Sequence, residues 1–189
     1  MSENQAAKKS SLSVKIGWLA GIVAAIAAAL TLYFTLWPKP SSIGEWKSKA
    51  TSVCNQDARD VKKDLRSAQE ALAVVYQDAQ VGSVPQGDFN SLTDAVNSLA
   101  GDQQKLVGDL QAIPRPGSNH SDVDTIINEQ AAGSQSVYRA SADLGSANVY
   151  DPNSVTVAVQ AASSDLGGAV SHLQNSQQAA GQLGVSCSA

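Results

Sequence analysis

A continuous stretch of 22 uncharged residues, from Ile16 to Trp37, constrains this chain more than any other feature. At about 1.5 Å per residue it forms a helix of about 33 Å, enough to cross a bilayer core of roughly 30 Å. A Pro-Lys-Pro run begins at Pro38 and stops the helix. Trp18 and Trp37 stand near its two ends, where aromatic rings prefer the membrane interface. We therefore predict a transmembrane helix over residues 16–37.

A cleavable secretory signal is the alternative, because Ala27 and Ala29 are small enough to mimic a cleavage site. The apolar run continues beyond them to Trp37, however, whereas the apolar region of a signal is usually about 7–15 residues long. No Cys follows the run closely, so a lipid-anchor site is absent. We predict an uncleaved signal-anchor with a cytoplasmic tail over 1–15, a linker or stalk over 38–53 and an extracytoplasmic domain over 54–189.

The orientation of this single-pass helix does not follow from its flanking charges. Three lysines precede the span and three follow it, so the positive-inside rule is nearly balanced: Lys8, Lys9, Lys15 against Lys39, Lys47, Lys49. The two cysteines decide between the orientations, because one disulfide between them would require an oxidising compartment outside the cytoplasm.

Cys54 and Cys187 each fall on an apolar stripe with alternating spacings of three and four residues, the pattern of a helix packed in a bundle. If four helices run up-down-up-down, the start of the first and the end of the last lie at one end of the bundle. A disulfide there would close a loop of about 130 residues and contribute on the order of 4–5 kcal/mol in the chain-entropy model. We predict this disulfide.

The chain supplies four such stripes, with turn signals between them. We expect helices over Cys54–Ala79, Asp88–Ile113, Ser121–Ala147 and Val155–Cys187. Asp88, Ser121 with Asp124, and Asp151 before Pro152 are the expected N-terminal caps. The Pro-Arg-Pro-Gly run at 114–117 ends the second helix, and no run of alternating β-branched residues indicates a sheet. The predicted fold class is all-α, a four-helix bundle behind one transmembrane helix.

Glutamines occupy stripe positions in the second and third helices, at Gln103 and Gln130. A buried amide needs a hydrogen-bond partner, and the expected outcome is a buried polar pair that fixes helix register. The alternative is a polar lining for a small ligand held between helices.

Small residues at every fourth position form a second pattern inside the predicted membrane helix. They resemble a GxxxG packing face and comprise Gly17, Gly21, Ala25 and Ala29. The alternative is that these small residues fall at this spacing by chance in an Ala-rich span. Homodimerisation through this face is the corresponding expectation.

The sequence contains no motif that is typical of catalysis or of cofactor binding. HExxH, CxxC, a Gly-rich phosphate loop and GxSxG are all absent, so we expect neither an enzyme nor a cofactor. The one tight cluster of metal-ligand types is His120, Asp122 and Asp124, whose acids are better explained by the positive end of the third helix. Residues 67–189 hold three Lys/Arg against twelve acids, which argues against nucleic acid as a partner.

Several short motifs resemble small envelope proteins of actinobacteria, which are mostly uncharacterised. They are the Pro-containing turn after Leu110–Ile113, the acid-bearing start of the next helix at Asp122-Val123-Asp124, and the Leu-Gly-x-x-Cys tail from Leu183 to Cys187. The resemblance implies a helical domain outside the cytoplasm and brings no activity or site residues. This chain differs from lipid-anchored members in using a membrane helix.

We expect a membrane-anchored structural or interaction protein of the cell envelope. Its expected partners are the lipid bilayer and a protein or cell-wall component. This reading predicts a dry core and an exposed face of small or apolar residues. The alternative is a ligand-binding or sensing bundle that acts through another membrane protein. It predicts a cavity near Gln103 and Gln130.

Overall fold

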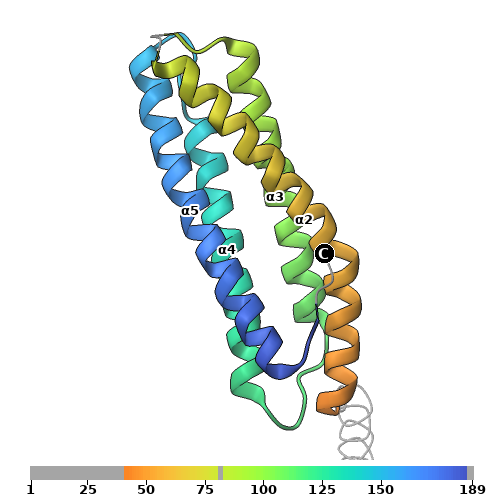
Figure 1. The fold of residues 1–189 in the computed structure, drawn as a ribbon. Helices are drawn as coiled ribbons and strands as arrows, with labels where there is room; N and C mark the ends of the chain where they lie inside the picture. Colours follow the sequence, from red (N-terminus) through yellow and green to blue (C-terminus); the bar gives the residue numbers. More distant parts are fainter. Residues whose placement is uncertain (1–40, 81–82, 187–189) are drawn as a thin grey trace, which may run out of the picture. The chain divides into compact units, whose positions relative to one another are not determined.

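Four long α-helices make up the residues that the computed structural model describes, 41–80 and 83–186. They are α2 (Ile43–Gln80), α3 (Gln86–Ala112), α4 (His120–Gly145) and α5 (Pro152–Leu183). Consecutive helices run in opposite directions, as Figure 1 shows, and α2 packs on α3, α3 on α4 and α4 on α5. The predicted all-α class and the up-down-up-down bundle are confirmed for this part of the chain.

The predicted transmembrane helix over 16–37 and the tail over 1–15 lie outside the described residues, and so does Cys187. The same holds for the packing face proposed within that span: Gly17, Gly21, Ala25, Ala29. Within 41–80 and 83–186, none of the helices is both long enough and apolar enough to cross a membrane.

The core is built from one stripe on each helix, and most of its buried residues stand at the predicted positions. In α4, however, the predicted Ser134 and Ser141 are only partly buried, and Ser136 and Ala140 are buried in addition. In α3 all seven stripe residues from Phe89 to Leu110 are buried, including Gln103. In α5 the buried positions include many small side chains: Ala158, Ala162, Ala169, Ser176, Ala180. Small side chains let helices approach closely but bury less apolar area, so each contact contributes less to stability.

The first helix begins earlier than predicted. Ile43 starts α2, and Trp46 and Ala50 are buried in the core, so residues 43–53 belong to the bundle and are not a separate stalk. The spacing explains the difference, because Trp46 and Ala50 continue the stripe of Cys54 in steps of four residues. The indole of Trp46 is fully buried among protein side chains, and not placed at a lipid surface.

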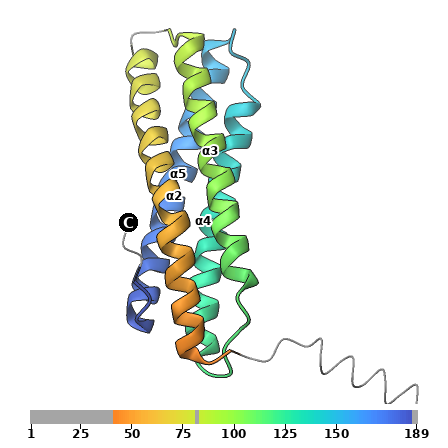
Figure 2. The same ribbon diagram turned by 90° about the vertical axis from the view of Figure 1, so that its right-hand side faces the viewer.

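The chain is fixed at the start of α2 by the Pro-rich loop between α3 and α4. The Ser41 hydroxyl donates to the carbonyl oxygen of Pro114 at 2.7 Å, and the Gly117 amide donates to the carbonyl oxygen of Ser41 at 3.1 Å. Pro116 is among the fully buried residues. The run that ends the second predicted helix therefore also holds the chain just before α2. Figure 2 shows the start of α2 and the loop between α3 and α4 at the lower end of the bundle.

Two helix starts differ from the sequence prediction and one agrees with it. Pro85 precedes α3 where Asp88 was expected, and Asn119, with a φ of 59°, precedes α4 where Ser121 was expected. Before α5, Asp151 is the N-cap as predicted: its carboxylate accepts from the Asn153 amide at 3.0 Å, and Pro152 follows it. Asp151 specifies a helix start more strongly than Asp88 or Ser121, because its carboxylate acceptor and the proline that follows it favour the same first turn.

The end of α5 is a Schellman-type turn that sends the chain back toward α2. Gly184 takes a φ of 78°, and the Val185 amide donates to the carbonyl oxygen of Ala180 at 2.8 Å. Val185 is buried, which is the apolar contact that accompanies this turn. The glycine of the Leu-Gly-x-x-Cys tail motif is thus explained, because the left-handed backbone at Gly184 favours glycine.

Substituting glycine by alanine is expected to have opposite effects inside α5, at Gly167, and at the residue that follows α5, Gly184. Gly167→Ala removes backbone freedom in an exposed helix interior where an added Cβ meets no atom within 4 Å, so it should raise the free energy of unfolding by about 0.5–1 kcal/mol. Gly184→Ala places a Cβ on a left-handed residue and should lower it by about 1–2 kcal/mol. Chemical denaturation of both variants checks this, and equal shifts of one sign would contradict it.

Candidate functional site

A cavity of about 530 Å³ lies between α2 and α5, within the range of roughly 300–1,000 Å³ typical of small-molecule sites. It exists because the first and last helices approach each other less closely than the other neighbouring pairs. In Figure 1 they separate toward the end where α2 begins.

The lining is mostly apolar and comes from all four helices. Ala58, Val61 and Leu65 of α2 face Val170 and Leu173 of α5 across it. Leu106 of α3 and Gln130 of α4 complete the wall, and Val185 of the tail lies at the same cavity as Cys54. The alanine at position 58 leaves space that a larger side chain of the same stripe would fill.

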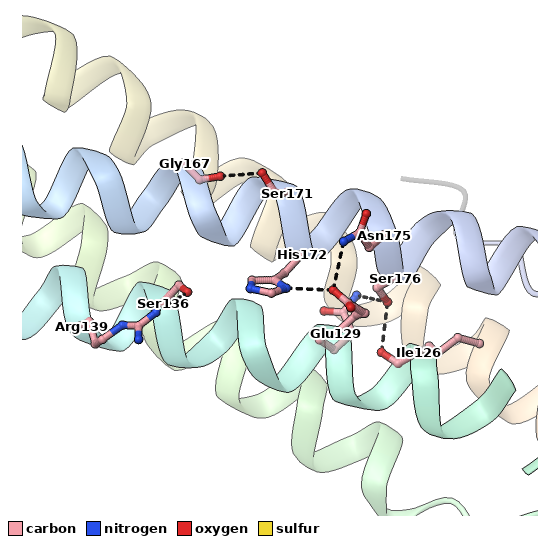
Figure 3. Close-up of polar contacts among 10 residues, drawn as sticks. Ile126, Glu129, Ser136, Arg139, Gly167, Ser171, His172, Asn175 and Ser176 are labelled. Carbon is pink, nitrogen blue, oxygen red and sulfur yellow. Dashed lines mark hydrogen bonds and ion pairs between the residues drawn. The ribbon is translucent and has the colours of Figure 1, made fainter. Parts of the chain in front are cut away.

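The amide of Gln130 is held by a short chain of hydrogen bonds between α4 and α5. Its Nε2 donates to the Ser176 hydroxyl at 3.0 Å, and that hydroxyl donates to the carbonyl oxygen of Ile126 at 3.2 Å. Figure 3 shows Ser176 beside Ile126 across the two helices. Because the carbonyl can only accept, the single hydroxyl proton is committed to it, and the hydroxyl must accept from Gln130.

The two glutamines singled out in the sequence are both buried, but they are not hydrogen-bonded to each other. Gln130 pairs with Ser176, and its Oε1 has no partner. Gln103 is completely buried and neither its Oε1 nor its Nε2 meets a partner. An unmet buried polar group costs about 1–3 kcal/mol, so these amides lower the stability of the fold. The expectation of a mutual polar pair is therefore wrong, and Gln130 is the one on the cavity wall.

His172 and Glu129 form a second polar contact between α4 and α5. The distance from His172 Nδ1 to Glu129 Oε2 is 2.8 Å, and Asn175 donates to the same oxygen at 3.3 Å, as Figure 3 shows. The hydrogen bond from His172 is the main cause that lowers the pKa of the Glu129 carboxyl, and the bond from Asn175 adds to it. His172 lies at the edge of the core, as its register predicts, and it is not among the residues lining the cavity.

The predicted disulfide is only half within the described residues. Cys54 is buried on α2 and is not a free cysteine. Its expected partner, Cys187, lies outside the described range, two residues after Val185 at the same cavity. The bond between Cys54 and Cys187 therefore stays a prediction.

The acids near His120 have partners of their own. Asp124 pairs with Arg115 at 3.0 Å, and Asn119 donates to Asp122 at 3.4 Å. Across the described ranges, no group of three His, Cys, Asp or Glu side chains is placed to hold a metal ion.

One ion pair of a buried carboxylate with a half-exposed lysine was not predicted from the sequence. Asp57 is 4% exposed and its carboxylate pairs with Lys105 of α3, which also contacts Asp109 at 3.1 Å. The hydrogen bond that Lys105 donates to the Asp57 carboxylate is the main cause that raises the pKa of Lys105. A signal was present, because Asp57 follows Cys54 by three residues and so shares its stripe.

We expect Glu129→Gln to destabilise the bundle near neutral pH and to have little effect in acid. Since the pKa of Glu129 is lowered from its ordinary 4.5, its contribution is present above that value and is lost as the pH falls through the lowered pKa. Glu70→Gln, at an exposed position of α2, is the matched control and should change stability little at any pH. Denaturation curves between neutral pH and strong acid check this, and a pH-independent loss would contradict it.

The chain matches no family model, no curated protein and no solved structure.

Proposed function

We propose that this protein is a membrane-anchored, extracytoplasmic helical bundle that binds a small apolar molecule between α2 and α5. The observation that carries the proposal is the cavity with the buried amide of Gln130 on its wall. The sequence left open a structural or interaction protein and a ligand-binding bundle. The second of these predicts a cavity near Gln103 and Gln130. The cavity is lined by Gln130, though not by Gln103, so the geometry supports the ligand-binding bundle better. Binding would reach the cell through another membrane protein.

The membrane location of the proposal rests on the sequence of residues 16–37 and the resemblance to actinobacterial envelope proteins. The extracytoplasmic side rests on the cysteines. Val185 and Cys54 line the same cavity, and Cys187 follows Val185 by two residues in the sequence. This supports an intramolecular disulfide between the first helix of the bundle and the segment that follows the last helix. An oxidised pair in turn supports a domain outside the reducing cytoplasm.

A second candidate function, contact with a partner protein, is favoured by apolar side chains at the opposite end of the bundle. Four exposed apolar residues belong to the last turns of α2, the loop before α5 and the first turns of α5: Val74, Tyr76, Tyr150, Val157. Tyr76 and Thr156 line one shallow depression there. A membrane-anchored bundle would present this end to a protein or cell-wall partner, while the face at Gly17 would serve for dimerisation within the bilayer.

The location is tested by alkylating the protein in intact cells and in isolated membranes, with and without reductant. We expect Cys54 and Cys187 to resist the reagent until reductant is added, and the two single Cys→Ser variants each to expose one reactive thiol. Two thiols that react in isolated membranes without reductant would place the domain on the cytoplasmic side.

Ligand binding is tested by photolabelling the full chain in lipid nanodiscs with an alkyl diazirine. Labelled peptides should include 58–65 of α2 and 170–177 of α5, with the predicted span over 16–37 as an internal reference. Ala58→Phe fills the cavity and should suppress the labelling of both peptides, whereas Ala73→Phe, at an exposed position of the same helix, should not. Labelling confined to residues 16–37 would contradict the proposal.

A further inference from the structure

We propose that the ligand of this cavity is an anionic amphiphile: one apolar chain lies in the cavity between α2 and α5, and its carboxylate or phosphate head contacts Lys62 at the rim. The inference rests on the proposed function, because it adds a charged head group to the apolar molecule that the same cavity takes. It follows from the charges on the two helices that border the cavity, from the level of its polar residues and from its length.

Helix α2 turns an acidic side toward α3. The carboxylate of Asp57 pairs with Lys105 of α3, and Asp64 lies within hydrogen-bonding reach of Asp102 of the same helix. These acids therefore mark the side of α2 that packs on α3. They do not line the cavity, which lies on the side of α2 toward α5.

A basic side of α2 borders the cavity. Lys62 is an exposed residue that belongs to the cavity lining, a place where lysine lays its aliphatic stem on an apolar wall and keeps its ammonium in water. Arg59 and Arg66, both exposed, precede and follow it at helical spacings of three and four residues, which put all three on one side of the helix. The next acid of α2 after Asp64 is Glu70, beyond the end of the lining on this helix.

The opposite rim of the cavity, on α5, is polar but uncharged. Its polar residues in the lining are Gln174 and Gln177, and no acidic side chain follows Asp165 in the sequence. Residues 67–189 hold twelve acids, yet this rim presents cations on one helix and neutral amides on the other. Charge complementarity therefore favours an anionic head over a cationic one.

Lys62 and these amides lie at one level of the cavity. Helices α2 and α5 are antiparallel (Figure 1), and Tyr76 and Val159 line one depression between them. Counting back along α2 from Tyr76 to Lys62, and equally far forward along α5 from Val159, leads to Leu173, next to Gln174. A head group at this level can accept charge-assisted hydrogen bonds from the ammonium and further bonds from the amides. Lys62 already takes part in an interaction of its own, and its three N–H donors allow the head group in addition.

The extent of the cavity along the helices favours a chain over a compact ring. Its lining runs from Cys54 to Leu65 on α2 and from Val170 to Ala180 on α5. Each stretch covers about 15–16 Å of helix at about 1.5 Å per residue. Because Lys62 stands near one end of this lining, a single alkyl or isoprenoid chain extends from there toward Cys54 and buries its methylenes on the apolar wall.

The test compares competitors of one chain length that differ in the head. The full chain in nanodiscs of a zwitterionic lipid is photolabelled with the alkyl diazirine while dodecanoate, dodecyl phosphate or dodecanol competes. The pH is held at about 9, where the acid is ionised and lysine is charged. The readout is peptide 170–177 of α5. Partition of each competitor into empty nanodiscs is measured and subtracted.

We expect the anions to protect this peptide at about one fifth of the alcohol concentration at low salt, since an ion pair at an exposed rim is worth about a factor of five. The advantage should shrink toward one in about 0.5 M salt, because exposed charges are screened. Dodecanoate ahead of dodecyl phosphate would identify the source as a fatty acid, and the reverse order a phosphorylated lipid; both support the proposal.

Two variants with the same change of net charge assign the preference to one lysine. Lys62→Gln should lose the preference for the anions and still bind the alcohol, because the cation is gone and the apolar wall remains. Lys63→Gln removes a neighbouring exposed lysine that does not line the cavity, and should keep the preference. Both variants leave the α5 peptide unchanged.

The outcomes separate this inference from the function on which it rests. Equal protection by the anions and the alcohol in the unmodified protein would overturn the anionic head and leave the cavity as a binding site. A preference that survives in Lys62→Gln would overturn the role of Lys62. Absence of labelled bundle peptides would overturn the proposed function itself. The comparison in the unmodified protein does not depend on whether either variant folds.

Discussion

A four-helix bundle closes only when its first helix meets its last, and in this chain that closure is made near the two ends. At one end the last turns of α2 meet the first turns of α5, around Tyr76 and Val159. At the other end the turn at Gly184 brings Val185 to the cavity beside Cys54. Between these points the two helices approach each other less closely than the other neighbouring pairs and leave a cavity of about 530 Å³. The interfaces of α2 with α3, α3 with α4 and α4 with α5 hold the bundle together. The incomplete interface between α2 and α5 creates the candidate site.

The fold was predictable because each helix repeats one apolar stripe over many turns. In α3 the stripe from Phe89 to Leu110 is buried residue by residue as the spacing indicates. The start of α2 was misplaced because the predicted stripe began at Cys54, although Trp46 and Ala50 continue it toward the N-terminus in steps of four residues. The starts of α3 and α4 were misplaced by a few residues, since a single capping side chain specifies a helix end weakly when a loop such as the one at Asn119 sets the backbone.

The candidate site was predictable only in part. The sequence places Gln130 in the core, but the length of a side chain does not tell which partner it reaches, and Ser176 lies 46 residues away on the next helix. The cavity itself results from the distance between α2 and α5, which no local pattern encodes. The ion pair of the buried Asp57 with the half-exposed Lys105 was missed for a related reason: a charged residue on a stripe is buried only when the neighbouring helix brings a counter-charge to it.

The contact between Ser41 and the loop at 114–117 has a mechanical consequence. The chain enters α2 through Ser41, which is hydrogen-bonded to Pro114 and Gly117. A force applied to the residues before Ser41 therefore acts first on the loop between α3 and α4, before it can separate α2 from the bundle. Trp46, buried one turn farther along, resists the same displacement. Tension from a tether would thus be shared by three helices at once, and the cavity wall formed by α2 would keep its position while the tether moves.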